Sequence, residues 1–99
     1  MLSSQLSPDG TTLTITPDGR FDFKIHQEFR HAYANAAGAR HYVINLGRTD
    51  YLDSSALGML LLLREHAGGD RADIRILNCK PDVHRIFQVA NFHKLFTLA

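Results

Sequence analysis

Residues 42–67, YVINLGRTDYLDSSALGMLLLLREHA, contain the stretch that decides the fold. The run at 42–46 is nearly continuous in apolar residues, which is typical of a strand covered on both sides. A second apolar segment runs from Ser54 to about Ala67, and Gly68-Gly69 would end a helix there. We therefore expect a buried strand followed by a helix packed on the same sheet.

The first quarter of the chain has the pattern of a β-hairpin. Residues 11–16, TTLTIT, place threonine alternately with leucine and isoleucine, which predicts a strand with one buried face. Residues 2–7 are the expected hairpin partner. Turn signals at Pro8-Asp9-Gly10 and Pro17-Asp18-Gly19 bound the strand, because proline presets the backbone of a turn and glycine supplies a positive φ.

The remaining segments complete an α/β pattern. Apolar residues on one helical face predict a helix that begins near Lys24 and ends at Gly38; they are Ile25, Phe29, Ala32, Tyr33 and Ala36. Residues 72–78 predict a strand, Pro81 suits the first position of a third helix, and residues 95–98 predict a short last strand. The order β-β-α-β-α-β-α-β indicates a mixed, mostly parallel sheet with helices packed on it.

Composition narrows the classes of function. The chain has 99 residues, 44% of them apolar, and a net charge of +1, which fits a single domain over residues 1–99. The balanced charge argues against direct binding of nucleic acid, and no apolar run approaches the ~20 residues of a membrane span. No secretory signal is visible and Cys79 has no partner for a disulfide. We therefore expect a cytoplasmic protein without membrane insertion.

Polar residues collect after the predicted parallel strands. Right-handed crossovers make these strands point the same way, so the loops that follow them gather at one edge of the sheet. The loop after the first of these strands holds Asp22, and the loop before the second helix holds Asp50, Asp53, Ser54 and Ser55. The spacing predicts a hydroxyl at a helix N-terminus with carboxylates nearby.

Two interpretations of this segment stay open from the pattern alone. Aspartate and serine are good N-cap residues, so residues 53–58 can serve only to start a helix. Alternatively, a serine here is phosphorylated, because a phosphate gains from the helix dipole and from free N–H groups. It would add about −1.5 to −2 charges beside Asp53 and alter a docking surface while leaving the fold intact.

Three motifs, in order along the chain, carry a family resemblance. They are GRFD at 19–22, DSSALG at 53–58 and PDVHRIF at 81–87. Together they resemble the STAS domains of the anti-sigma factor antagonists. The corresponding signatures of that family are Gly-x-hydrophobic-Asp, Asp-Ser-Ser-Gly-Leu-Gly and Pro-x-Val-x-Arg-hydrophobic-Phe, and the match spans nearly the whole chain.

The resemblance implies a binding switch, with no catalysis by this chain and no cofactor. In the family, an anti-sigma factor that is a serine kinase uses ATP to phosphorylate the first serine after the aspartate, and a PP2C-like phosphatase reverses the reaction. The unphosphorylated form captures the anti-sigma factor and frees a sigma factor. Carried to this chain, Ser54 is the phosphate acceptor, Ser55 is the lesser candidate, and Asp22 and Asp53 shape the partner-binding face.

The chain departs from the family pattern at two places. Ala56 stands where the signature has glycine, a mild change because alanine is the better helix former. Phe23-Lys24 follows Asp22 where many relatives carry small polar residues, so partner choice can differ. Apolar side chains exposed beside Ser54 would form a docking patch; the candidates are Phe21, Phe23, Tyr51, Leu52 and Met59, of which we expect Phe23 and Tyr51 to contact a partner.

Two other functions remain open. An accessory subunit of a membrane transporter complex, never phosphorylated, would also be a single STAS domain. An enzyme that used Asp22, Asp53 and Ser54 would need a base for the serine, and no histidine is placed by the sequence for that role. The six histidines lack a metal-binding motif, so we expect no metal site.

Overall fold

A five-stranded sheet forms the base of the computed structural model, which describes all residues from Met1 to Ala99. Its strands are β1 (Leu2–Leu6), β2 (Thr12–Pro17), β4 (His41–Asn45), β6 (Asp73–Leu77) and β7 (Thr97–Leu98), and they lie in the order β1-β2-β4-β6-β7. The β1–β2 pair is antiparallel, and the other three pairs are parallel. The prediction of a mixed, mostly parallel sheet is confirmed.

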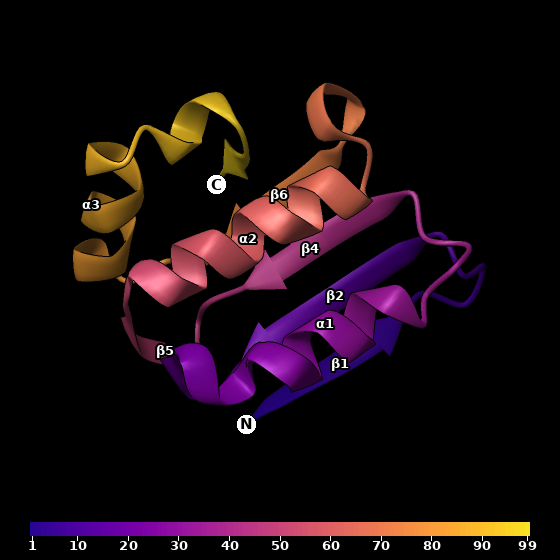
Figure 1. The fold of residues 1–99 in the computed structure, drawn as a ribbon, viewed down its shortest axis with the longest axis horizontal. Coiled ribbons are helices and arrows are strands. Elements are labelled where there is room, and N and C mark those ends of the chain that lie inside the picture. The colour runs from indigo at the N-terminus through magenta and orange to yellow at the C-terminus, as the bar shows by residue number, and fades with distance from the viewer.

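Three α-helices accompany the sheet: α1 (His26–Ala34), α2 (Ser54–His66) and α3 (Pro81–Val89). Figure 1 shows α1 and α2 side by side across one face of the sheet, with α3 at one end. Short 3₁₀ helices at 23–25, 69–71 and 92–94 join the elements. None of the helices has the length and apolar character needed to cross a bilayer.

The helices cover only one face of the sheet. In β2, Leu13 and Ile15 are buried, and the threonines that alternate with them are only half-buried. In β4, Tyr42 and Ile44 are buried but Val43 is half-buried. The prediction that this strand is covered on both sides is therefore wrong, because no helix packs on the face that carries Val43.

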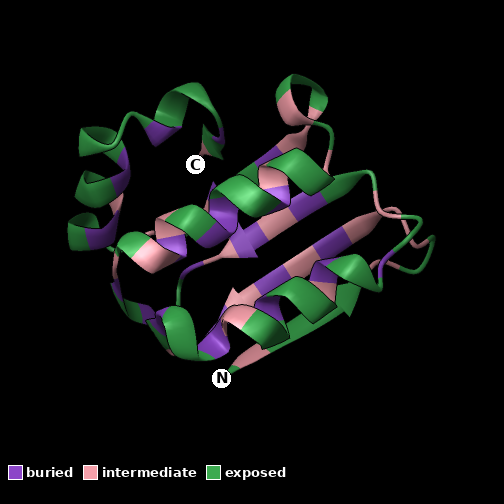
Figure 2. Cartoon of the chain, viewed as in Figure 1, coloured by how far each residue is buried: buried purple, intermediate pink, exposed green.

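The core lies between the sheet and the helices and contains 21 buried apolar residues. Figure 2 shows the buried positions on the inner sides of the helices and on the strands beneath them. At the C-terminal end, the ring centroids of Phe87 and Phe92 are 5.7 Å apart, and those of Phe92 and Phe96 are 5.2 Å apart. This stack of rings packs the last segment of the chain against α3.

A second, two-stranded sheet was not predicted. It consists of β3 (Gly19–Phe21) and β5 (Thr49–Leu52), which are parallel. Each strand is too short to show a clear alternation, and their pairing joins segments about thirty residues apart, so the local sequence carries little signal for it. The segments after β2 and β4, which were expected to be loops, therefore contain the short strands β3 and β5.

Helix α1 is shorter than predicted. It follows a 3₁₀ turn at 23–25 and ends at Ala34 with Asn35 as its C-cap, so Gly38 is not the cap. The N–H of Ala36 donates to the carbonyl of Tyr33 at 3.2 Å, an i to i−3 bond that tightens the chain before the glycine is reached. Helix α2, in contrast, begins at the predicted Ser54.

Candidate functional site

The two short parallel strands deliver two carboxylates to one place. Phe21 at the end of β3 pairs with Leu52 at the end of β5. Asp22 directly follows β3 and Asp53 directly follows β5, so the two aspartates lie at the same edge of this small sheet. The structure thus brings together Asp22 and Asp53, which the sequence placed at the carboxyl edge of the sheet.

Asp53 is the N-cap of α2. Its Oδ1 accepts hydrogen bonds from the backbone N–H of Ser55 at 3.0 Å and of Ala56 at 3.3 Å, and from the Ser55 hydroxyl at 2.5 Å. The Ser55 hydroxyl and these backbone donors stabilise the carboxylate and lower the pKa of Asp53, although partial burial opposes the shift. The carboxylate therefore remains ionised and holds the start of the helix.

The two serines after this cap differ in their surroundings. The Ser55 hydroxyl donates to Asp53, and its residue is half-buried. Ser54, the first residue of α2, is exposed, and its hydroxyl has no hydrogen-bond partner in the protein. Only the Ser54 hydroxyl is thus free to meet another molecule without the loss of a bond.

Asp22 has a mainly structural position. It is buried, and its Oδ1 accepts from the backbone N–H of Lys24 at 3.0 Å, which caps the 3₁₀ turn before α1. Its Oδ2 accepts from Nε of Arg20 at 3.2 Å. The Arg20 guanidinium also lies 4.1 Å from the centroid of the Tyr51 ring, its cross-strand partner. Arg20 was not singled out as a site residue, and only the β3–β5 register reveals its place.

The charges around the site are unevenly matched. Asp22 is paired with Arg20, and Asp50 forms an exposed ion pair with Lys80. Asp53 has no basic side chain within 4.0 Å. Its negative charge is balanced only by hydrogen-bond donors of α2, so the surface beside Ser54 carries one carboxylate without a basic partner.

The apolar candidates divide clearly into buried and exposed residues. Phe21, Leu52 and Met59 are core residues. Phe23 is 68% exposed and Tyr51 is 43% exposed. The Phe23 ring stacks on His26 with centroids 5.0 Å apart, which holds this exposed ring in place. Both exposed rings thus lie close to an aspartate in the chain: Phe23 directly follows Asp22, and Tyr51 lies two residues before Asp53.

The outer face of α2 extends the surface beyond Ser54. Gly58 and Leu62 follow at helical spacings of four and eight residues, and Leu62 is 59% exposed. A Cβ added at Gly58 would meet no atom within 4 Å, so this glycine is not required by packing inside the protein. Leu62 also lines a groove of about 440 Å³ between α1 and α2. The spacing of these residues from Ser54 was the signal that could have identified them.

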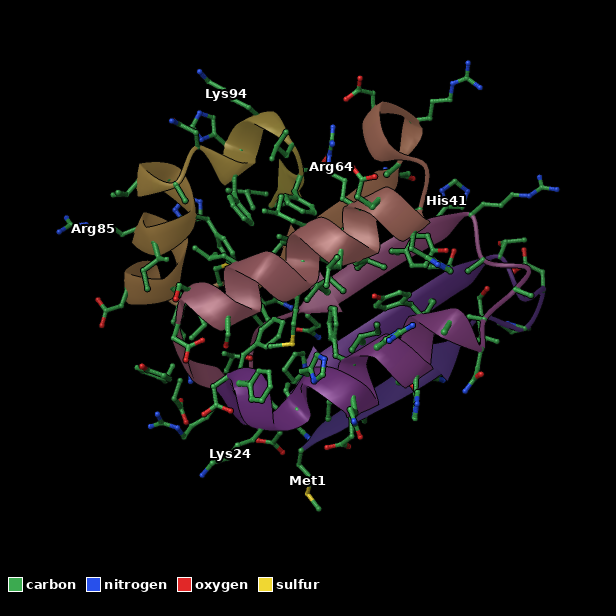
Figure 3. The ribbon with its side chains drawn as sticks, in the orientation of Figure 1. Met1, Lys24, His41, Arg64, Arg85 and Lys94 are labelled. Carbon is green, nitrogen blue, oxygen red and sulfur yellow. The ribbon has the colours of Figure 1, made fainter.

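The histidines form no metal site, and the basic side chains of Arg20 and Lys80 near Ser54 are paired with Asp22 and Asp50. No three His, Cys, Asp or Glu side chains are placed to hold a metal ion. His41 lies at the opposite end of β4, where its Nδ1 is 2.5 Å from Oδ2 of Asp73. Figure 3 shows Lys24, Arg85 and Lys94 pointing outward at separate places on the molecule.

Comparison with known proteins identifies the family. The family described as "Mlab, STAS domain" matches residues 4–98. The chain belongs to the STAS domain family. A STAS-domain containing protein of Pseudomonas aeruginosa (strain UCBPP-PA14) is 54% identical over 94 residues, which covers 94% of this STAS domain and 93% of the relative.

Relatives and solved structures connect this STAS domain with anti-sigma factor antagonists. BtrV of Bordetella bronchiseptica, named as an anti-sigma factor antagonist, is 31% identical over 62 residues, which cover 63% of the chain and 53% of BtrV. The unphosphorylated form of the anti-sigma factor antagonist SpoIIAA superposes with a TM-score of 0.74 at 20% identity, over 89% of this chain and 82% of that one. The phosphorylated form of SpoIIAA from Bacillus gives 0.67 at 20% identity, over 98% and 91%. The domain therefore has the fold of the anti-sigma factor antagonists.

Proposed function

We propose that this STAS domain is a partner-switching regulator controlled by reversible phosphorylation of Ser54. Its unphosphorylated form binds an anti-sigma factor that is also a serine kinase, and a PP2C-like phosphatase restores that form. The domain acts in the cytoplasm as a binding protein, without catalysis, cofactor, or direct contact with nucleic acid or bilayer. One observation carries the proposal: the Ser54 hydroxyl is exposed and unpartnered at the start of α2, whereas Asp53 holds the Ser55 hydroxyl.

A phosphate on Ser54 would change the charge of this surface strongly. It would add about −1.5 to −2 charges beside Asp53, which has no basic partner. The donors of α2 that could compensate the phosphate are partly used, because the N–H groups of Ser55 and Ala56 already bind Asp53. Much of the added charge would therefore face solvent or a bound partner.

The proposed partner face combines this charge switch with exposed apolar groups. Phe23 and Tyr51 supply aromatic contact area, and Gly58 allows a partner to approach the backbone of α2 closely. Asp53 and Asp22 contribute mainly by shaping the two helix starts. A partner that excludes water from this face would have to desolvate the phosphate, which is costly unless a cation pairs with it.

Mass spectrometry of the protein from its native cells tests the acceptor. Wild type, Ser54→Ala and Ser55→Ala are expressed there with a tag, and intact mass and phosphopeptides are measured. We expect a phosphate-sized increment in wild type and Ser55→Ala, and none in Ser54→Ala. Thermal unfolding of each variant checks that the helix start is intact. An increment that persists in Ser54→Ala, or no increment in any growth condition, would refute the proposal.

Partner capture from the same cells tests the switch. We expect Ser54→Ala to retain an anti-sigma-type kinase and Ser54→Asp to bind it at least tenfold more weakly, a difference of about 1.4 kcal/mol. Asp82→Asn is the charge control, because this exposed residue lies in the first turn of α3. Equal capture of a membrane transporter ATPase by both Ser54 variants would favour the transporter subunit instead.

A further inference from the structure

We propose that the free edge of β1 pairs with the same edge of a second copy of this chain, so that two domains share one continuous sheet. β1 is the outermost strand and has β2 as its only neighbour. Figure 2 shows that β1 is exposed or half-buried along its whole length. This inference goes beyond the proposed switch and does not depend on it.

The backbone groups of β1 divide into two sets. The carbonyl of Met1 accepts from the N–H of Asp18, and the N–H of Ser7 donates to the carbonyl of Thr12. Since hydrogen-bonded residues alternate along an antiparallel pair, the backbone N–H and C=O groups of the odd-numbered residues of β1 point toward β2. The N–H and C=O groups of Leu2, Ser4 and Leu6 therefore point to the open edge.

The sequence of β1 is self-complementary about its centre. Residues 2–6 read LSSQL, so an antiparallel pair centred on Ser4 places Leu2 of each copy opposite Leu6 of the other. Ser4 then lies opposite itself, and all three pairs are of the hydrogen-bonded type with two bonds each. Every open backbone group of Leu2, Ser4 and Leu6 would find a partner in this register.

The usual devices that prevent edge pairing are missing from β1. Native edges are often protected by charged residues, prolines or bulges. Residues 2–6 contain no charge and no proline, and their pairing with β2 runs without a bulge. The other edge differs, because β7 has only two residues and presents a much shorter ladder.

Exposed apolar surface and free space on the helix-covered side of β1 also favour a second copy of this chain as the partner. Leu2, Ser4 and Leu6 pair with Pro17, Ile15 and Leu13, which are buried, so their side chains lie on that side. Leu6 is nonetheless 44% exposed, beside a groove of about 530 Å³ between β1 and α1. The Leu2–Leu6 pairs across the twofold axis would cover this exposed surface.

The dimer would leave both Ser54 sites accessible. The twofold axis is perpendicular to the sheet, so the strands of one copy run opposite to those of the other. The carboxyl edges that carry Ser54 then face in opposite directions, at the two ends of the shared sheet. The assembly would be bivalent, with one docking face on each side.

Disulfide trapping tests the register. In a Cys79→Ser background, Ser4→Cys would place the two Cα atoms about 5.5 Å apart across the twofold axis, within the range that a disulfide spans. Leu6→Cys is the matched control, because its two Cα atoms would be about 14 Å apart, four residues of strand. We expect a covalent dimer from Ser4→Cys under mild oxidation and little from Leu6→Cys. Equal cross-linking of both variants, or none, would overturn the proposal.

Sedimentation over a range of protein concentrations tests whether the dimer forms through the edge of β1. Ser4→Pro removes an N–H that faces solvent in the monomer, so the fold should be retained while the dissociation constant of the dimer rises at least tenfold. Val89→Lys is the control, since this residue is 79% exposed on α3 and its change lowers surface hydrophobicity and adds a positive charge without touching β1. A wild-type protein that is monomeric at all concentrations, or a dimer that survives Ser4→Pro but not Val89→Lys, would contradict pairing through β1.

Discussion

Helices α2 and α3 both begin after parallel strands, yet their first turns differ chemically. At α2 the Asp53 carboxylate binds two backbone N–H groups, and the next residue presents a free hydroxyl. At α3 the N-cap position is Lys80, which makes no capping bond, and Pro81 fills the first helical position. Proline needs no partner for the N–H it lacks, so α3 starts without a polar network.

This difference shows that the fold alone does not make a helix start functional. The same strand-to-helix connection gives a carboxylate and a free hydroxyl at the start of α2, but a lysine and a proline at the start of α3, whose first turn also carries Asp82. Lys80 reaches Asp50 and thereby links the two regions by an exposed ion pair. Because exposed ion pairs contribute little to stability, each helix depends on its own start and its own core contacts.

The largest effect is expected where α3 meets the core. Since α3 has no side-chain cap, its position depends on buried residues such as Phe87, which is fully buried and stacks near Phe92. Phe87→Ala should lower the free energy of unfolding by about 3–5 kcal/mol, measured by urea denaturation. Val89→Ala, at an exposed site of the same helix, should change it by less than about 0.5 kcal/mol. A loss below about 1 kcal/mol for Phe87→Ala, comparable with the effect of surface substitutions, would contradict the core role of this ring.

An intermediate, pH-dependent effect is expected at the start of α2. Hydrogen bonding lowers the pKa of Asp53 in the folded state, so its contribution to stability is present above the ordinary aspartate pKa near 4 and is lost as the pH falls through the folded value. Asp53→Ala should therefore lower the melting temperature by several degrees at neutral pH and by less in acid. Asp82→Ala in α3 is the matched control, because Asp82 makes no capping bond. Equal losses for the two variants at neutral pH would remove the difference between the helix starts.

The smallest effect is a gain in stability on the outer face of α2. Gly58→Ala should raise the free energy of unfolding by about 1 kcal/mol, because the new methyl group meets no atom and alanine is the better helix former. Gly47→Ala is the contrasting change, since its Cβ would lie 3.2 Å from Oδ1 of Asn45 and should give no gain. If Gly58 is there for a partner, the same variant should bind the captured kinase more weakly despite its higher stability. An unchanged free energy of unfolding in Gly58→Ala would contradict this prediction, because the glycine would then not destabilise the helix.

Most of the main architecture could be predicted from the sequence because its signals are local. Alternating threonines identified β2, and the apolar run ending at Gly68-Gly69 identified α2 with its first residue correct. The order of these elements and the right-handed crossover then place Asp22 and Asp53 at one edge. The sequence also contained the motif at 53–58 that led to the STAS family.

Other features depend on contacts between distant segments, which the sequence does not display. The β3–β5 pair, the Arg20–Tyr51 contact and the bare face of β4 all arise from packing. The sequence by itself determined that two serines follow a helix-capping aspartate, because a cap motif is local. Only the tertiary structure decided that Ser54 is exposed while Ser55 is half-buried, because the burial of each residue depends on how α2 packs on the sheet.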